Sequence, residues 1–180
     1  TWIAMKNNVV IALFVIFLLL TVLMRSFILP FVIVITVPIA GAGGVMGLVV
    51  LNQFTAQSLD MLTMLGFIIL TGIVVNNSIL MVEQTLWHIR YESMKISEAI
   101  TEATRNRIRP IFMSTLTSLF GLSPLVIFPG SGSELYRGIG TVVFGGLSTS
   151  AILTLVMVPP LLALALKFEK LKPISQTKQD

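Results

Sequence analysis

Apolar residues form five long blocks along the chain, separated by short polar stretches. The blocks cover about 8–24, 29–51, 61–82, 111–128 and 138–166. About 20 apolar residues in an α-helix cross the ~30 Å hydrocarbon core of a bilayer, so each block is long enough for a transmembrane helix. The pattern therefore predicts an all-α integral membrane bundle with five transmembrane helices.

The polar stretch between the third and fourth blocks predicts a sixth helix of another kind. Apolar residues recur at helical spacing from Ile96 to Ala103, and Ser97 is suited to cap the helix start. We expect an amphipathic helix over about 97–108 that lies on the cytoplasmic surface of the membrane. The polar tail over 171–180 is expected to be disordered.

Composition and charge support a membrane protein and suggest its orientation. Hydrophobic residues make up 55% of the chain and charged residues only 11%. Ten of the twelve basic residues fall on one side in this arrangement, which with an odd number of spans predicts a cytoplasmic C-terminus. The ten are Arg25, Arg90, Lys95, Arg105, Arg107, Arg109, Lys167, Lys170, Lys172 and Lys178, against Lys6 and Arg137 on the other side. The pI near 9.8 therefore needs no nucleic-acid partner.

Several kinds of chemistry lack the residues that they need. The chain has no cysteine and one histidine, His88, which we place at the headgroup level beside Trp87 without a catalytic role. No nucleophile with a base, HExxH motif or pair of intramembrane carboxylates occurs, so we predict no enzyme activity, metal site or cofactor. The chain begins at Thr1 with no signal peptide before the first block, which suggests a segment of a longer protein.

Two adjacent carboxamides, Asn76 and Asn77, lie well inside the third apolar block. An unpartnered amide in hydrocarbon costs about 4–8 kcal/mol by alkane transfer, so both are expected to face other helices or water. Ser114 lies at a similar depth in the fourth block, and Arg107 precedes it by two turns on the same helix face. These four residues are the candidate polar site.

Small residues predict where the helices pack closely. Gly43 and Gly47 are four residues apart in the second block, and Gly145 stands at the same spacing between two threonines in the fifth. Gly72 and Gly121 lie on the faces of the third and fourth blocks that carry the polar groups. We expect these five glycines to lie at helix contacts.

Four features occur in an order that resembles one family. A hairpin turn leads into a Pro/Gly-rich span, followed by GIVVNNSILMVE, by RNRIRPIFMSTLTSLFGLSPL and by GSGSELYRGIGTVVFGGL. Together they resemble the C-terminal membrane region of resistance-nodulation-division (RND) efflux pumps, and most closely the hydrophobe/amphiphile multidrug branch. The resemblance covers nearly all of the chain.

The resemblance implies a function and partners. Such pumps are homotrimers of the bacterial inner membrane that export drugs and other amphiphiles by proton antiport, with a periplasmic adaptor and an outer-membrane channel. This chain would supply the C-terminal half of the proton-relay bundle, beside an N-terminal transmembrane half, which carries the acids, and periplasmic domains. The partners of those acids match Asn76, Ser114 and Arg107, with Asn77 adjacent. Many drug pumps carry a lysine at position 76, so the relay here would use hydrogen bonds instead of that ion pair.

Two other interpretations remain open. The chain could belong to another RND component, a protein-translocation auxiliary or a lipid exporter, although the auxiliaries usually have an acid where Ser78 stands. It could also be a structural module that only packs and oligomerises through its glycines. That interpretation does not explain the paired amides, and replacement of Asn76 by leucine would separate a module from a relay.

Overall fold

A computed structural model of the chain describes residues 2–54, 59–128, 130 and 133–168. They form five helices: α1 (Trp2–Met24), α2 (Ile28–Asn52), α3 (Met61–Tyr91), α4 (Ile96–Ile127) and α5 (Ser133–Phe168). No strand occurs in these ranges, which confirms the all-α prediction. The predicted disordered tail, 171–180, lies outside the described residues.

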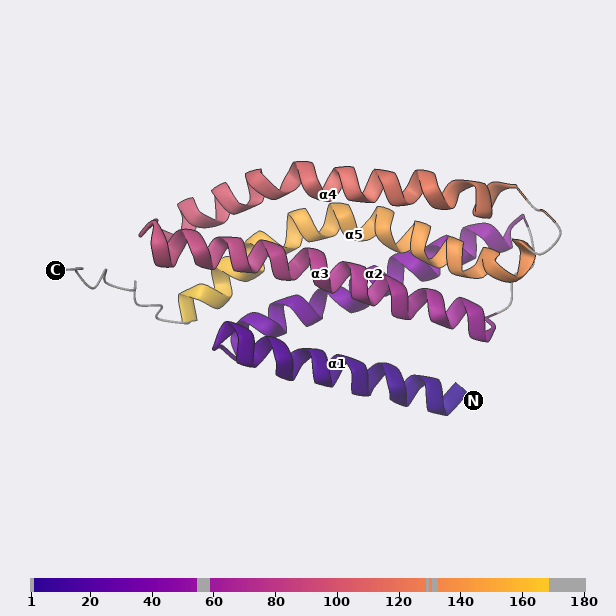
Figure 1. The fold of residues 1–180 in the computed structure, drawn as a ribbon, viewed down its shortest axis with the longest axis horizontal. Coiled ribbons are helices and arrows are strands. Elements are labelled where there is room, and N and C mark those ends of the chain that lie inside the picture. Colours follow the sequence, from indigo (N-terminus) through magenta and orange to yellow (C-terminus); the bar gives the residue numbers. More distant parts are fainter. Residues whose placement is uncertain (1, 55–58, 129, 131–132, 169–180) are drawn as a thin grey trace.

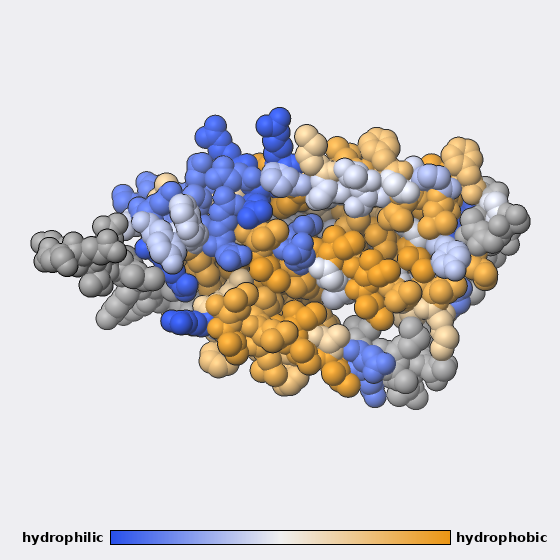
Figure 2. Space-filling model, viewed as in Figure 1, coloured by the Kyte–Doolittle hydropathy of each residue, from blue (hydrophilic) through white to orange (hydrophobic). Residues whose placement is uncertain are grey.

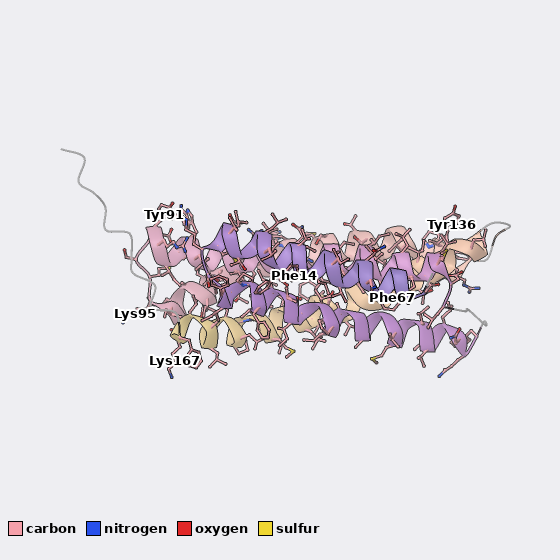
Figure 3. The ribbon with its side chains drawn as sticks, turned by 90° about the horizontal axis from the view of Figure 1, so that it is seen from below. Phe14, Phe67, Tyr91, Lys95, Tyr136 and Lys167 are labelled. Carbon is pink, nitrogen blue, oxygen red and sulfur yellow. The ribbon has the colours of Figure 1, made fainter. Side chains whose placement is uncertain are left out.

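The five helices lie side by side and alternate in direction (Figure 1). The turns between α1 and α2 and between α3 and α4 lie at one end of the bundle, together with the end of α5. Figure 3 places Tyr91, Lys95 and Lys167 at this end and Tyr136 at the other. We call them the Lys95 end and the Tyr136 end.

Four of the helices are long and apolar enough to cross a membrane. They are α2, α3, α4 and the part of α5 from Leu135 to Phe168. In α1 the apolar stretch among the described residues, Val10–Met24, is shorter than a usual span. The fifth transmembrane span therefore stays a prediction.

The predicted surface helix and fourth span are one continuous helix, α4, which corrects the sequence analysis. Pro110 lies inside it, although a proline removes one backbone hydrogen bond. The reason is a single buried face: Ala99, Ala103, Ile111 and Thr115 are all buried, at spacings that keep them on one side of the helix across the proline. The polar first half of α4 remains visible as a hydrophilic surface in Figure 2.

The ends of several helices also differ from the predictions. Lys95 is the N-cap residue of α4 and its side chain makes no capping hydrogen bond, so Ser97 lies in the first turn instead of capping it. Arg137 lies inside α5 and not in a loop, and its Nε donates to the carbonyl oxygen of Val126 over 3.1 Å.

Asp60 is the N-cap residue of α3. Its carboxylate accepts a hydrogen bond from the backbone N–H of Thr63 at 2.7 Å. Hydrogen bonds from the Thr63 side chain and backbone lower the pKa of the Asp60 carboxyl group.

Helix α5 is the common neighbour of α2, α3 and α4, and its glycines allow the close approach. A methyl group at Gly145 would lie 2.8 Å from the carbonyl oxygen of Gly43 and 2.8 Å from the Cα of Gly47, both in α2. A methyl group at Gly146 would overlap the side chain of Leu70 in α3. One at Gly140 would meet Leu125 of α4 at 3.0 Å, so α5 packs on a different helix through each glycine.

Gly72 and Gly121 differ from the prediction of close packing. Nothing described lies within 4 Å of a methyl group placed at either position, and both residues are exposed in this structure. Their helices meet the glycines of α5 through other residues, Leu70 of α3 at Gly146 and Leu125 of α4 at Gly140.

A buried pair of hydroxyls joins α2 to α3. Thr36 Oγ1 donates its one proton to the carbonyl oxygen of Ile33 over 2.6 Å. The hydroxyl of Ser78, 3.2 Å from Thr36 Oγ1, therefore donates to it. With Ser78 held against α2, Asn76 and Asn77 turn to other sides of α3, at about 100° per residue.

We expect Thr36→Val and Ser78→Ala to be coupled. Each variant removes the same interhelical hydrogen bond, so the double variant should be more stable than the sum of the single effects predicts, by about 0.6 kcal/mol. Equilibrium unfolding of the four proteins in mixed detergent micelles measures the coupling. Strictly additive effects would show that the two hydroxyls do not interact.

Candidate polar site between helices three and four

A hollow of about 210 Å³ lies between α3 and α4 and contains all four residues of the predicted polar site. It is lined by Asn76, Asn77, Leu80, Arg107, Pro110, Ile111 and Ser114. Asn77 and Arg107 are half-buried, whereas Asn76 and Ser114 are exposed. The hollow therefore opens to the surface of this bundle and does not lead into its core.

The register of the two antiparallel helices explains why these residues meet. The Nε of Arg107 donates to the Oε1 of Gln84 over 2.6 Å and fixes α4 against α3 at that level. Asn77 lies seven residues before Gln84, and Ser114 lies seven residues after Arg107. Seven residues are about two helical turns, so the same step along each helix brings Asn77 and Ser114 to one level on facing sides.

The amides of Asn76 and Asn77 have unused hydrogen-bonding capacity. Neither side chain forms a hydrogen bond within the part of the chain that the structure describes. A carboxamide offers two N–H donors and a carbonyl acceptor, so it can meet either a carboxylate or a protonated carboxyl group. The hydroxyl of Ser114 donates to the carbonyl oxygen of Ile111 over 3.1 Å, which leaves its oxygen free to accept.

Arg107 brings a fixed positive charge to the hollow. Its Nε is held by Gln84, while the rest of the guanidinium has further N–H donors in a planar fork. Among the described side chains, no carboxylate pairs with the guanidinium of Arg107. The hollow can thus hold a carboxylate through charge-assisted hydrogen bonds, but its own lining residues include no acid.

Gln84 is the site residue that the sequence analysis missed. It lies at the edge of the third apolar block, where a polar residue needs no special explanation. The available signal was its spacing, because a position seven residues from Asn77 shares the same face of the helix.

A comparison with known protein families identifies the family of this chain. The family model described as AcrB/AcrD/AcrF family matches residues 4–165, most of the chain. The chain belongs to the AcrB/AcrD/AcrF family. It is therefore part of a multi-pass membrane transporter of the RND superfamily, which confirms the family resemblance that the four motifs indicate.

The single histidine of this AcrB/AcrD/AcrF-family chain lies outside the hollow and beside Trp87, as predicted, while its position at the headgroup level stays a prediction. His88 is buried, and its Nδ1 lies 2.6 Å from the Oε2 of Glu92. Its other ring nitrogen, Nε2, is buried without a hydrogen-bond partner among the described residues. Trp87 is half exposed, with its ring edge-on to that of His88 at 5.3 Å between centroids. The described residues contain no group of three or more His, Cys, Asp or Glu that could hold a metal.

Proposed function

We propose that this chain forms the C-terminal half of the proton-relay bundle in an inner-membrane transporter that exports drugs or other amphiphiles in exchange for protons. The observation that carries the proposal is the hollow between α3 and α4, where a serine hydroxyl and an arginine held by Gln84 meet two amides that have no hydrogen-bond partner among the described residues. In hydrocarbon such groups need a partner, and one carboxylate can accept hydrogen bonds from the amide N–H groups and from the guanidinium at once.

The proposed relay depends on the protonation state of that carboxylate, which would come from the N-terminal transmembrane half. When it is ionised, it accepts hydrogen bonds from the guanidinium of Arg107 and from the amide N–H groups of Asn76 and Asn77. Protonation removes the attraction to Arg107, whereas the carbonyl oxygens of the amides can still accept from the carboxyl O–H. The two states thus favour different positions of the acid-bearing helix against α3 and α4, which couples proton binding to movement.

The proposed working unit extends beyond this chain. It is a homotrimer with periplasmic domains, attached to a periplasmic adaptor and an outer-membrane channel, and its C-terminus lies in the cytoplasm. The clustering of Arg90, Lys95 and Lys167 at one end of the bundle supports this orientation, because cytoplasmic loops are enriched in basic residues (Figure 3).

Replacement of Asn76 by leucine in the full-length transporter tests the proposal. The loss of a hydrogen bond to a charged group costs about 1.5–3 kcal/mol, which corresponds to a transport rate lower by about 10- to 100-fold. Efflux of a fluorescent amphiphile and proton uptake are measured together in proteoliposomes with an imposed pH gradient. Thr117→Leu is the matched control, since its hydroxyl donates to the carbonyl oxygen of Met113 and it does not line the hollow.

Both fluxes should fall together in Asn76→Leu, while the transporter still inserts and forms trimers. Wild-type rates with an unchanged dependence on the pH gradient would contradict the relay. Such a result would favour a packing role for α3 instead.

A further inference from the structure

A second and larger hollow, of about 560 Å³, runs along the contact between α2 and α5. From α5 it is lined by Arg137, Thr141, Phe144, Gly145, Ser148 and Thr149. Opposite α5 it extends from Phe54, just after the end of α2, to Gly43 within α2, and the last turn of α4 closes one side with Val126 and Ile127. We call it the α2–α5 groove.

The groove lies along the helices and therefore along the expected membrane normal. Arg137 and Thr149 are twelve residues apart in α5, which is about 18 Å of helix. Glycines at 43, 47 and 145 let α2 and α5 approach closely, and the groove follows this contact between the side chains of Met46 and Phe144. The groove thus has the length and direction of a phospholipid acyl chain in one leaflet.

The interior of the groove is apolar even where its lining residues carry hydroxyls. Thr141 donates to the carbonyl oxygen of Arg137 at 2.9 Å, Ser148 to that of Phe144 at 2.8 Å and Thr149 to that of Gly145 at 2.9 Å. Each hydroxyl proton is used within α5, as is usual for Ser and Thr in membrane helices. What remains for an occupant is a surface of methyl, methylene and aromatic groups.

The single charge of the groove stands at its outer rim. Arg137 is half-buried and is held in place by the bond from its Nε to the Val126 carbonyl oxygen, which leaves the remaining guanidinium N–H groups available. Among the side chains that the structure describes, which do not include that of Glu134, no carboxylate pairs with Arg137. Figure 3 shows the adjacent Tyr136 at the end of the bundle, the level at which Tyr is enriched in membranes and at which phospholipid headgroups lie.

We propose that the α2–α5 groove is a binding site for an anionic phospholipid of the leaflet at the Tyr136 end. Arg137 binds the headgroup phosphate by charge-assisted hydrogen bonds, and one acyl chain lies in the groove between Phe144 and Met46 as far as Gly43 and Thr149. The polarity of the site fits only this direction, since the cation is at the membrane surface and the apolar end is in the core. The site is separate from the α3–α4 hollow and does not depend on the proposed relay.

The test uses the full-length transporter in nanodiscs that contain phosphatidylglycerol with a photoactivatable group in its acyl chain. We expect crosslinks to peptides of α2 and α5 that line the groove. Arg137→Gln should reduce this labelling at least tenfold, and Arg137→Lys should retain most of it. Lysine keeps the charge but has no guanidinium Nε to bond Val126, so the pair separates binding of the headgroup from support of the helix end.

Two further variants complete the test. Ser148→Phe fills the groove and should abolish the crosslinks, whereas Arg109→Gln removes an exposed charge of α4 outside the groove and should leave them unchanged. Labelling that persists in Arg137→Gln and Ser148→Phe would overturn the proposal. So would an absence of labelling in the wild type, which would mean that another helix of the transporter covers the groove. Equal labelling by an uncharged diacylglycerol probe would also refute the role of Arg137.

Discussion

Replacement of Gly145 by alanine is expected to destabilise the bundle by about 1–3 kcal/mol, the usual cost of overpacking. In an isolated helix the same change is favourable by about 1 kcal/mol, so the sign of the effect reports on packing alone. The added methyl group would lie 2.8 Å from two backbone atoms of α2, the Gly43 carbonyl oxygen and the Gly47 Cα. Backbone atoms of a packed helix cannot rotate aside, and α2 and α5 must therefore separate.

Gly121→Ala is the matched control, because nothing described lies within 4 Å of a methyl group there. Thermal denaturation in detergent, followed by loss of the folded fraction in size-exclusion chromatography, compares the two variants. We expect a lower melting temperature for Gly145→Ala and an equal or higher one for Gly121→Ala. Similar melting temperatures would show that α2 and α5 are not in close contact at Gly145.

Replacement of Arg107 by leucine is expected to reduce proton-coupled transport at least 100-fold, more than any other change in the hollow. The variant removes the one positive charge among the residues that line the site and leaves an incoming carboxylate without a charged partner in low dielectric. Gln84→Leu should have a smaller effect, about tenfold, because it removes only the bond of 2.6 Å that positions the guanidinium.

The two variants should also differ in their response to conservative replacement. Arg107→Lys keeps the positive charge without the planar fork, so it should retain part of the transport that Arg107→Leu loses. Gln84→Glu keeps a hydrogen-bond acceptor, but its carboxylate would pair with the guanidinium and compete with the incoming acid, so it should not retain more transport than Gln84→Leu. Arg105→Leu, an exposed position on the same helix, controls for the loss of a basic residue. The measurement is the ratio of drug efflux to proton uptake across a range of internal pH. An unchanged ratio and rate in Arg107→Leu would contradict the role of Arg107 in proton coupling.

The sequence predicts the helices better than their ends. Long apolar runs in the sequence locate the helices, because a helix surrounded by lipid needs such a run. The prediction separates α4 into a surface helix and a span, because the sequence changes from polar to apolar near Pro110. The continuous buried stripe through Ala103 and Ile111 outweighs the lost hydrogen bond, and that balance depends on packing against α3, which no local pattern reports.

The site shows the same limit. Asn76, Asn77, Arg107 and Ser114 can be grouped from their residue types and helical spacing, and the structure places all four around one hollow. For Gln84 the spacing shows only that it shares a helix face with Asn77; its bond to Arg107 depends on the register of α3 against α4, which spacing does not report. Likewise, spacing alone treats Gly121 and Gly145 as equals, whereas only Gly145 faces the backbone of another helix.

The central place of α5 has a consequence for biosynthesis. The helices that it joins, α2, α3 and α4, all precede it in the chain, so they enter the membrane before their shared neighbour has been made. Until α5 arrives, Gly43, Gly47 and the side chain of Leu70 face lipid or the insertion machinery. Assembly of this bundle is therefore completed after translation of α5, and nascent chains that stall earlier should be targets for membrane proteases.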